Sequence, residues 1–102
     1  MVRFFRLCLE YIIMRHQMEN ILKNELRTLA IRERDELNLT QRKMAEALVM
    51  SETSYSDIEC GDNMCGTLTA ILLIMRLDDP NEFIQHLKGK FKELYDREMS
   101  LL

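Results

Sequence analysis

Residues 34–77 read RDELNLTQRKMAEALVMSETSYSDIECGDNMCGTLTAILLIMRL, and this stretch decides the fold. Thr40 and Ser51 each stand directly before a segment of helix-forming residues, where N-caps are expected. We therefore predict short helices over 41–49 and 52–59, with the second stopped by Gly61. The connection over 49–51 is so short that the two helices must cross at a steep angle, which is typical of a helix-turn-helix.

The two predicted helices each have a narrow apolar face. Met44, Ala45 and Leu48 lie at i, i+1 and i+4, while Tyr55 and Ile58 lie at i and i+3. Residues with these spacings share one side of a helix, so we expect all five to face a common core.

The flanking segments also predict helices. No Gly or Pro precedes Gly61, so residues 1–37 form either one long helix or two in tandem with a break near 18–20, where Asn20 can act as a cap. Residues 68–77 are apolar nearly all round, which predicts a buried central helix capped by Thr67. Asn81 is expected to cap a last helix over 82–101, in which Gly89 allows either close packing or a kink. Its predicted apolar stripe comprises Phe83, Leu87, Phe91, Leu94 and Tyr95.

Length and composition agree with an all-α fold. A chain of 102 residues with 47% hydrophobic and 30% charged residues suits one soluble domain. Three Gly and one Pro leave few turns between long elements. Within this single domain we distinguish an N-terminal helical extension over 1–25, a helix-turn-helix core over 26–79 and a C-terminal helix over 80–102, which packs on the core or on a partner.

The segment over 34–77 resembles the lambda-repressor-like (XRE) helix-turn-helix family. The matching residues are Arg34, Leu39-Thr40-Gln41, Met44-Ala45, Ser51, Tyr55, Ile58-Glu59 and Gly61. The resemblance implies a core of four to five helices and an ion pair between Arg34 and Glu59, which holds the first helix to the third. It also implies sequence-specific DNA binding, with the 52–59 helix in the major groove.

The resemblance assigns roles to a set of candidate DNA-binding residues. Ser51 and the start of the 41–49 helix would position the DNA backbone, because Arg42 and Lys43 can contact phosphates. Base edges would face the 52–59 helix. The complete set is Gln41, Arg42, Lys43, Ser51, Glu52, Thr53, Ser54 and Asp57.

Three departures from the family pattern weaken the DNA-binding interpretation. Val49 stands where the family often has Gly, although a β-branched residue resists a positive φ. Asp62 and Asn63 stand where a basic residue often follows Gly61. Two of the four base-facing positions, Glu52 and Asp57, are acidic, and carboxylates repel phosphates. The net charge of −3, with −4 over residues 31–66, adds to this conflict.

Two functions therefore stay open. The first is a DNA-binding transcriptional regulator with double-stranded DNA as its partner. The second is a protein-interaction module, such as an antitoxin-like or anti-repressor partner, that keeps the fold but binds DNA weakly or not at all. We expect no enzyme activity and no cofactor, because neither a catalytic set nor a phosphate-binding loop is recognisable. We also expect no metal site, since Cys60 and Cys65 have no second ligand pair nearby.

The N-terminal segment VRFFRLCLEYIIM (2–14) is interpreted as an amphipathic helix. Arg6 and Glu10 interrupt its apolar run, so it suits neither a signal peptide nor a membrane span. Three scattered cysteines are typical of a reducing cytosol. We expect a homodimer in which the apolar residues of 1–18 pack on the partner's last helix, at Phe91, Leu94, Tyr95 and Met99. Packing within one chain is the first alternative, and the second is a translation start at Met18, which would leave residues 1–17 as disordered surplus.

Overall fold

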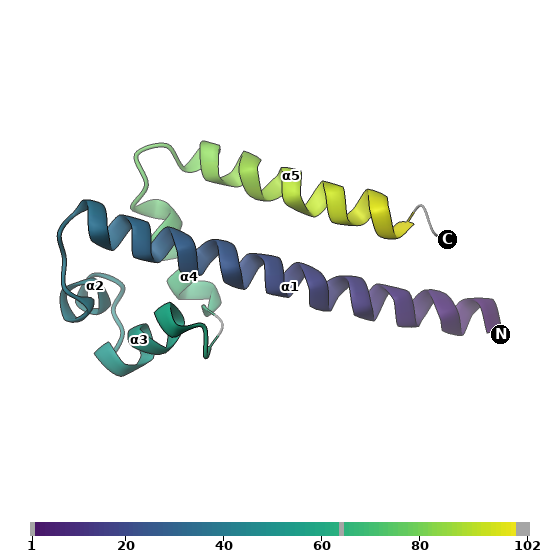
Figure 1. Cartoon of the computed structure of the whole chain (residues 1–102), viewed down its shortest axis with the longest axis horizontal. Coiled ribbons are helices and arrows are strands. Elements are labelled where there is room, and N and C mark those ends of the chain that lie inside the picture. Colours follow the sequence, from purple (N-terminus) through teal and green to yellow (C-terminus); the bar gives the residue numbers. More distant parts are fainter. Residues whose placement is uncertain (1, 64, 100–102) are drawn as a thin grey trace.

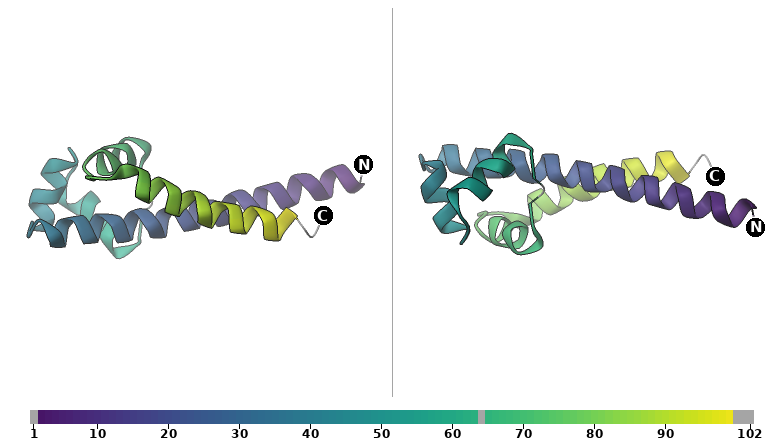
Figure 2. Two further views of the ribbon diagram at one scale, coloured as in Figure 1. Left: turned by 90° about the horizontal axis from the view of Figure 1, so that it is seen from above. Right: turned by 90° about the horizontal axis from the view of Figure 1, so that it is seen from below.

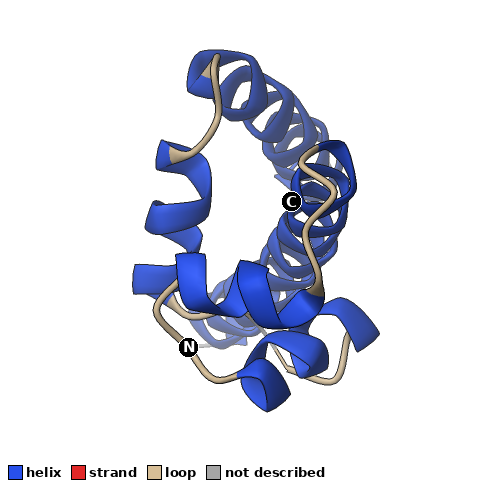
Figure 3. Cartoon of the chain, turned by 90° about the vertical axis from the view of Figure 1, so that its left-hand side faces the viewer, coloured by secondary structure: helices blue, strands red, loops and turns tan. Residues whose placement is uncertain are grey.

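The computed structural model describes residues 2–63 and 65–99, with the side chains of 2–7 and 99 outside the description. The described residues form five helices: α1 (Val2–Glu36), α2 (Gln41–Ala47), α3 (Glu52–Cys60), α4 (Thr67–Met75) and α5 (Pro80–Met99) (Figure 1). The described ranges contain helices and loops but no strand (Figure 3). The all-α prediction is therefore confirmed.

α1 is one continuous helix of 35 residues. The break that we considered near residues 18–20 is absent, because Asn20 stays within the regular helix. The helix ends at Glu36, and Asn38 then adopts a left-handed conformation with φ of 54°. Asn tolerates this region better than most residues do, so Asn38 turns the chain towards α2.

The caps of α2 and α3 fall where the sequence places them. The Thr40 hydroxyl accepts a hydrogen bond from the backbone N–H of Lys43, and the Ser51 hydroxyl accepts one from that of Ser54, both at 3.1 Å. α3 ends at Gly61, whose φ of 81° is left-handed. α2 ends at Ala47 rather than at Val49, and Val49 itself adopts φ of 57°. The turn thus holds Val49 in the left-handed conformation that a β-branched side chain disfavours.

α4 corrects two predictions. It is not a buried central helix, because Leu73 is its one buried residue, while Leu68, Ile71 and Met75 are 67%, 49% and 72% exposed. The main contacts of α4 are with α1 and α5, so the helix has more apolar faces than close neighbours. Its N-cap is Gly66 rather than Thr67, which is the first helical residue.

α5 begins two residues earlier than predicted. Pro80 is its first residue, a position that suits the fixed φ of proline. The Asp79 carboxylate, not Asn81, accepts the backbone N–H of Glu82 at 3.3 Å. A Cβ at Gly89 would meet nothing within 4 Å, so this glycine serves no close packing. The predicted end near Leu101 and the side chain of Met99 lie outside the description.

The hydrophobic core lies at one end of the molecule. Leu26 and Leu29 of α1 pack with residues of the other helices, and Tyr55 and Ile58 are 0% and 5% exposed as predicted. The core residues are Leu26, Leu29, Ala30, Met44, Ala45, Leu48, Tyr55, Ile58, Cys65, Leu73 and Phe83.

The first half of α1 and most of α5 extend away from this core. They run side by side beyond α2, α3 and α4, and the start of α1 and the end of α5 lie at the far end (Figures 1 and 2). The radius of gyration is 16.3 Å, whereas a compact domain of this length has about 13 Å. We call residues 8–21 of α1 together with residues 84–98 of α5 the arm.

Candidate nucleic-acid interface

The start of α3 is exposed to solvent. Ser51, Glu52, Thr53 and Ser54 are all exposed, while Tyr55 directly after them is fully buried. The Ser51 hydroxyl also donates to the Ser54 hydroxyl at 2.9 Å, so the two serines fix each other across the first turn. α3 therefore rests on the core through Tyr55 and Ile58 and presents four polar side chains outward.

The two cations at the start of α2 share one carboxylate. Arg42 Nε lies 3.6 Å from Glu46 Oε1, and Lys43 Nζ lies 3.8 Å from Glu46 Oε2. All three side chains are more than half exposed. Exposed pairs of this kind are worth about 0.5 kcal/mol, so Glu46 restrains Arg42 and Lys43 only weakly.

Asp57 faces the loop that follows α3. Its carboxylate accepts the Asn63 side-chain amide at 3.3 Å, and its backbone carbonyl accepts the N–H of Asp62 at 2.9 Å. These bonds give Asp57 a role in ending α3, beside the base-facing role that the resemblance implies.

Arg34 and Glu59 form a two-pronged ion pair. Arg34 Nε donates to Glu59 Oε2 at 2.6 Å and Nη2 donates to Oε1 at 2.9 Å, while Nη1 donates to the Leu39 carbonyl at 3.2 Å. The Glu59 side chain is only 7% exposed and that of Arg34 is 21% exposed. Gln41 Nε2 donates to Glu59 Oε1 at 3.2 Å, so the predicted phosphate-contacting amide is engaged inside the molecule. α1, α2 and α3 thus meet at one carboxylate.

Arg27 belongs to the same junction, although the sequence patterns did not reveal it. Its Nε donates to the Glu59 backbone carbonyl at 2.6 Å, which satisfies an acceptor in the last turn of α3. Arg27 precedes Arg34 by seven residues, which is close to two helical turns. The spacing places the two arginines on one face of α1, but it does not identify the group to which Arg27 bonds.

The junction shifts the pKa values of its members. Burial acts to raise the pKa of Glu59, but the hydrogen bonds from Arg34, the neighbouring Tyr55 hydroxyl and the hydrogen bond from Gln41 outweigh it and hold the pKa below its ordinary value. The hydrogen bond to Glu59 raises the pKa of Arg34. Burial, followed by the neighbouring Glu59, raises the pKa of Tyr55. Glu59 is therefore ionised and Tyr55 neutral at pH 7.

The surface around α2 and α3 has an acidic balance. Arg42 and Lys43 are the two basic residues of 40–63, against the acidic residues Glu46, Glu52, Asp57, Glu59 and Asp62. Glu59 is neutralised by Arg34, which leaves four acidic side chains around the two cations. The arrangement offers hydroxyl groups for recognition but little positive potential.

Comparisons of the chain with protein-family models, curated proteins and solved structures find no match in any of the three. No helix of the described residues is both long and apolar enough to cross a membrane. Across residues 2–63 and 65–99, no three Cys, His, Asp or Glu side chains are grouped as ligands of a metal ion.

Proposed function

We propose that this chain is a sequence-specific DNA-binding regulator of transcription that acts in the cytoplasm. In this proposal α2, the turn and α3 form a lambda-repressor-like helix-turn-helix, and α3 enters the major groove. The observation that carries the proposal is the exposed start of α3 on a rigid base. Ser51 to Ser54 face solvent, while Glu59 at the other end of the helix is fixed by Arg34 and Gln41.

The proposed contacts fall into two kinds. Arg42, Lys43 and Ser51 hold phosphates and set the orientation of α3, which carries no sequence information. Glu52, Thr53 and Ser54 face base edges, where hydroxyls bond to several bases and a carboxylate accepts from cytosine N4. Gln41 contributes indirectly, because its bond to Glu59 ties the start of α2 to α3.

Substitutions separate the two kinds of contact. Arg42→Ala or Lys43→Ala should weaken binding to all duplexes alike and reduce the salt slope by about one for each phosphate that is no longer neutralised. Thr53→Ala or Ser54→Ala should instead change the preference among sequences at unchanged salt slope. Fluorescence anisotropy with labelled duplexes measures both effects. If all four variants bind like the wild type, α2 and α3 are not the DNA-binding surface.

The second candidate function is a protein-interaction module, and one specific observation favours it. Glu46 lies within 4 Å of both Arg42 and Lys43, while Glu52 and Asp57 add further negative charge on α3. Carboxylates in these places repel phosphates but suit a basic protein surface.

Glu46→Gln distinguishes the two candidates. A DNA-binding surface should bind duplexes more tightly and with a steeper salt slope once Arg42 and Lys43 are released from Glu46. If α2 and α3 instead bind a basic protein, the Glu46→Gln variant should show no detectable DNA binding. Leu37→Gln, an exposed substitution without a change of charge, serves as the control.

A further inference from the structure

The arm carries more apolar surface than its own two helices bury. Met14 and Leu94, which are 9% and 3% exposed, form the closed seam between α1 and α5. Outside this seam six large apolar side chains are 42–65% exposed: Leu9, Tyr11, Ile12, Ile13, Ile84 and Tyr95. The apolar residues of α1 are therefore only partly buried by packing within one chain, which was the first alternative to a homodimer.

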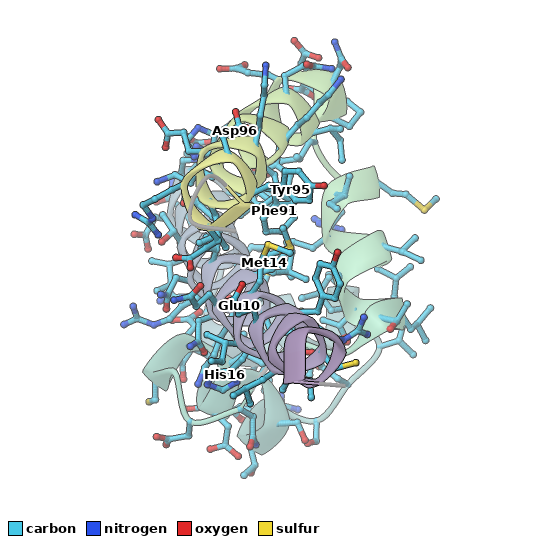
Figure 4. The ribbon with its side chains drawn as sticks, turned by 90° about the vertical axis from the view of Figure 1, so that its right-hand side faces the viewer. Glu10, Met14, His16, Phe91, Tyr95 and Asp96 are labelled. Carbon is cyan, nitrogen blue, oxygen red and sulfur yellow. The ribbon has the colours of Figure 1, made fainter. Side chains whose placement is uncertain are left out.

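An apolar groove of about 560 Å³ runs along the arm. Ile84, Leu87, Phe91 and Tyr95 of α5 line it together with Met18 of α1. Figure 4 shows Phe91 and Tyr95 on the same side of the two helices as Met14, whereas His16 and Asp96 point away. Apart from Lys88 and Lys92 at its rim, the lining is apolar. A groove of this kind excludes a charged ligand and suits an apolar helix.

The exposed area matches what a dimer needs. The six exposed side chains of the arm do not share one face, because consecutive residues of α1 point about 100° apart. Tyr11 lies two turns from Met18 and therefore on the groove side, whereas Leu9, Ile12 and Ile13 point elsewhere. On the groove side, three exposed and three half-buried side chains leave roughly 400 Å² in contact with water, taking about 150–250 Å² for a whole large apolar side chain as the scale; they are Tyr11, Ile84, Tyr95, Met18, Leu87 and Phe91. A standard interface covers about 800 Å² on each partner, of which a little over half is apolar. Self-association through the arm would thus remove about the apolar area that a stable interface contains.

The shape of the arm indicates that a second copy of the chain binds in the groove. Two antiparallel helices with one closed seam form half of a four-helix bundle, and a second copy of the same pair supplies the other half. The groove and the side chains that protrude beside it, such as Tyr95 at 47% exposure, lie on the same arm, as the self-complementary surface of a two-fold dimer requires.

We propose that a second copy of this chain docks on the arm groove, so that α1 and α5 of two chains form an antiparallel four-helix bundle. The bundle joins two copies at the end opposite α2 and α3 and leaves both α3 helices free. It does not depend on DNA binding, because only the residues of the arm carry it.

Three large apolar side chains with similar exposure provide a matched test on the full-length protein. Tyr11 of α1 is 48% exposed and Ile84 of α5 is 42% exposed, both on the groove side of the arm. Ile71 of α4 is 49% exposed and lies outside the arm. The substitutions Tyr11→Glu and Ile84→Glu place a charge at the proposed interface, whereas Ile71→Glu places the same charge on α4.

Sedimentation velocity over a wide range of concentrations measures the mass, and circular dichroism verifies the helix content of each variant. We expect twice the chain mass of 12.2 kDa for the wild type and for Ile71→Glu. Tyr11→Glu and Ile84→Glu should each weaken the dimer at least tenfold. The proposal is overturned if the wild type stays monomeric. It is also overturned if both arm variants still form the dimer, or if only Ile71→Glu abolishes it. DNA binding is measured separately, so failure of the dimer and failure of the proposed function are distinguishable.

Discussion

At the scale of single residues, Glu59 is the most connected side chain of the fold. It is the one buried charged residue of the described chain, and it accepts from Arg34 through both oxygens. Replacement by Gln removes the charge and leaves Arg34 partly buried without its partner. We expect Glu59→Gln to lower the free energy of unfolding by about 2–3 kcal/mol at pH 7. Urea denaturation measures this loss, and Glu46→Gln, at an exposed pair, should cost about 0.5 kcal/mol at most.

The same residue makes stability depend on pH. Because folding lowers the pKa of Glu59 below its ordinary value of 4.5, its stabilisation is present above that pH. The stabilisation is lost as the pH falls through the folded-state pKa. The difference in unfolding free energy between wild type and Glu59→Gln should therefore shrink when urea denaturation is repeated at successively lower pH below 4.5. A constant difference would show that Glu59 acts through shape rather than charge.

At the scale of elements, the turn between α2 and α3 contains a strained residue. Val49 has φ of 57° and its side chain is 78% exposed, so the conformational cost is not offset by burial. Gly adopts this conformation freely, whereas the left-handed region costs other residues about 1 kcal/mol. We expect Val49→Gly to raise the free energy of unfolding by about 0.5–1 kcal/mol, as measured in urea. Val49→Ala keeps the Cβ and should gain less; an equal gain would place the strain elsewhere.

The sequence predicts helices well where local chemistry decides. Thr40, Ser51 and Gly61 mark helix ends through side-chain hydrogen bonds and a left-handed cap, and the structure has all three. It predicts burial less well, because burial depends on neighbours. Leu68, Ile71 and Met75 read as core residues, yet α4 has helices against only part of its surface.

For the candidate interface, the sequence likewise predicts which residues are exposed but not the contacts between helices. Exposure of Ser51 to Ser54 follows from the burial of Tyr55 and Ile58 on the opposite face of α3. The engagement of Gln41 with Glu59 and the bond from Arg27 could not be predicted, because they depend on how closely α1 approaches α2 and α3.

At the scale of the whole molecule, the two proposed interaction surfaces lie at opposite ends. The core end holds α2 and α3, while the arm, with the start of α1 and the end of α5, extends the longest dimension to 53 Å. The sequence indicated an apolar surplus in residues 1–18, but periodicity alone could not divide it between the seam with α5 and the exposed groove. Two copies joined by their arms would carry four exposed cations on their α2 helices, Arg42 and Lys43 of each chain.

The central claim, that the exposed start of α3 binds DNA, is tested most directly by the salt dependence of binding. The full-length protein is titrated into random-sequence and genomic duplexes at a series of salt concentrations, with fluorescence anisotropy as the readout. We predict that log Kobs falls linearly with log salt, with a slope of roughly −2 to −4 for the cations of one to two chains. At least one genomic fragment should bind more tightly than random DNA. If no fragment binds above background at low salt, the claim is contradicted.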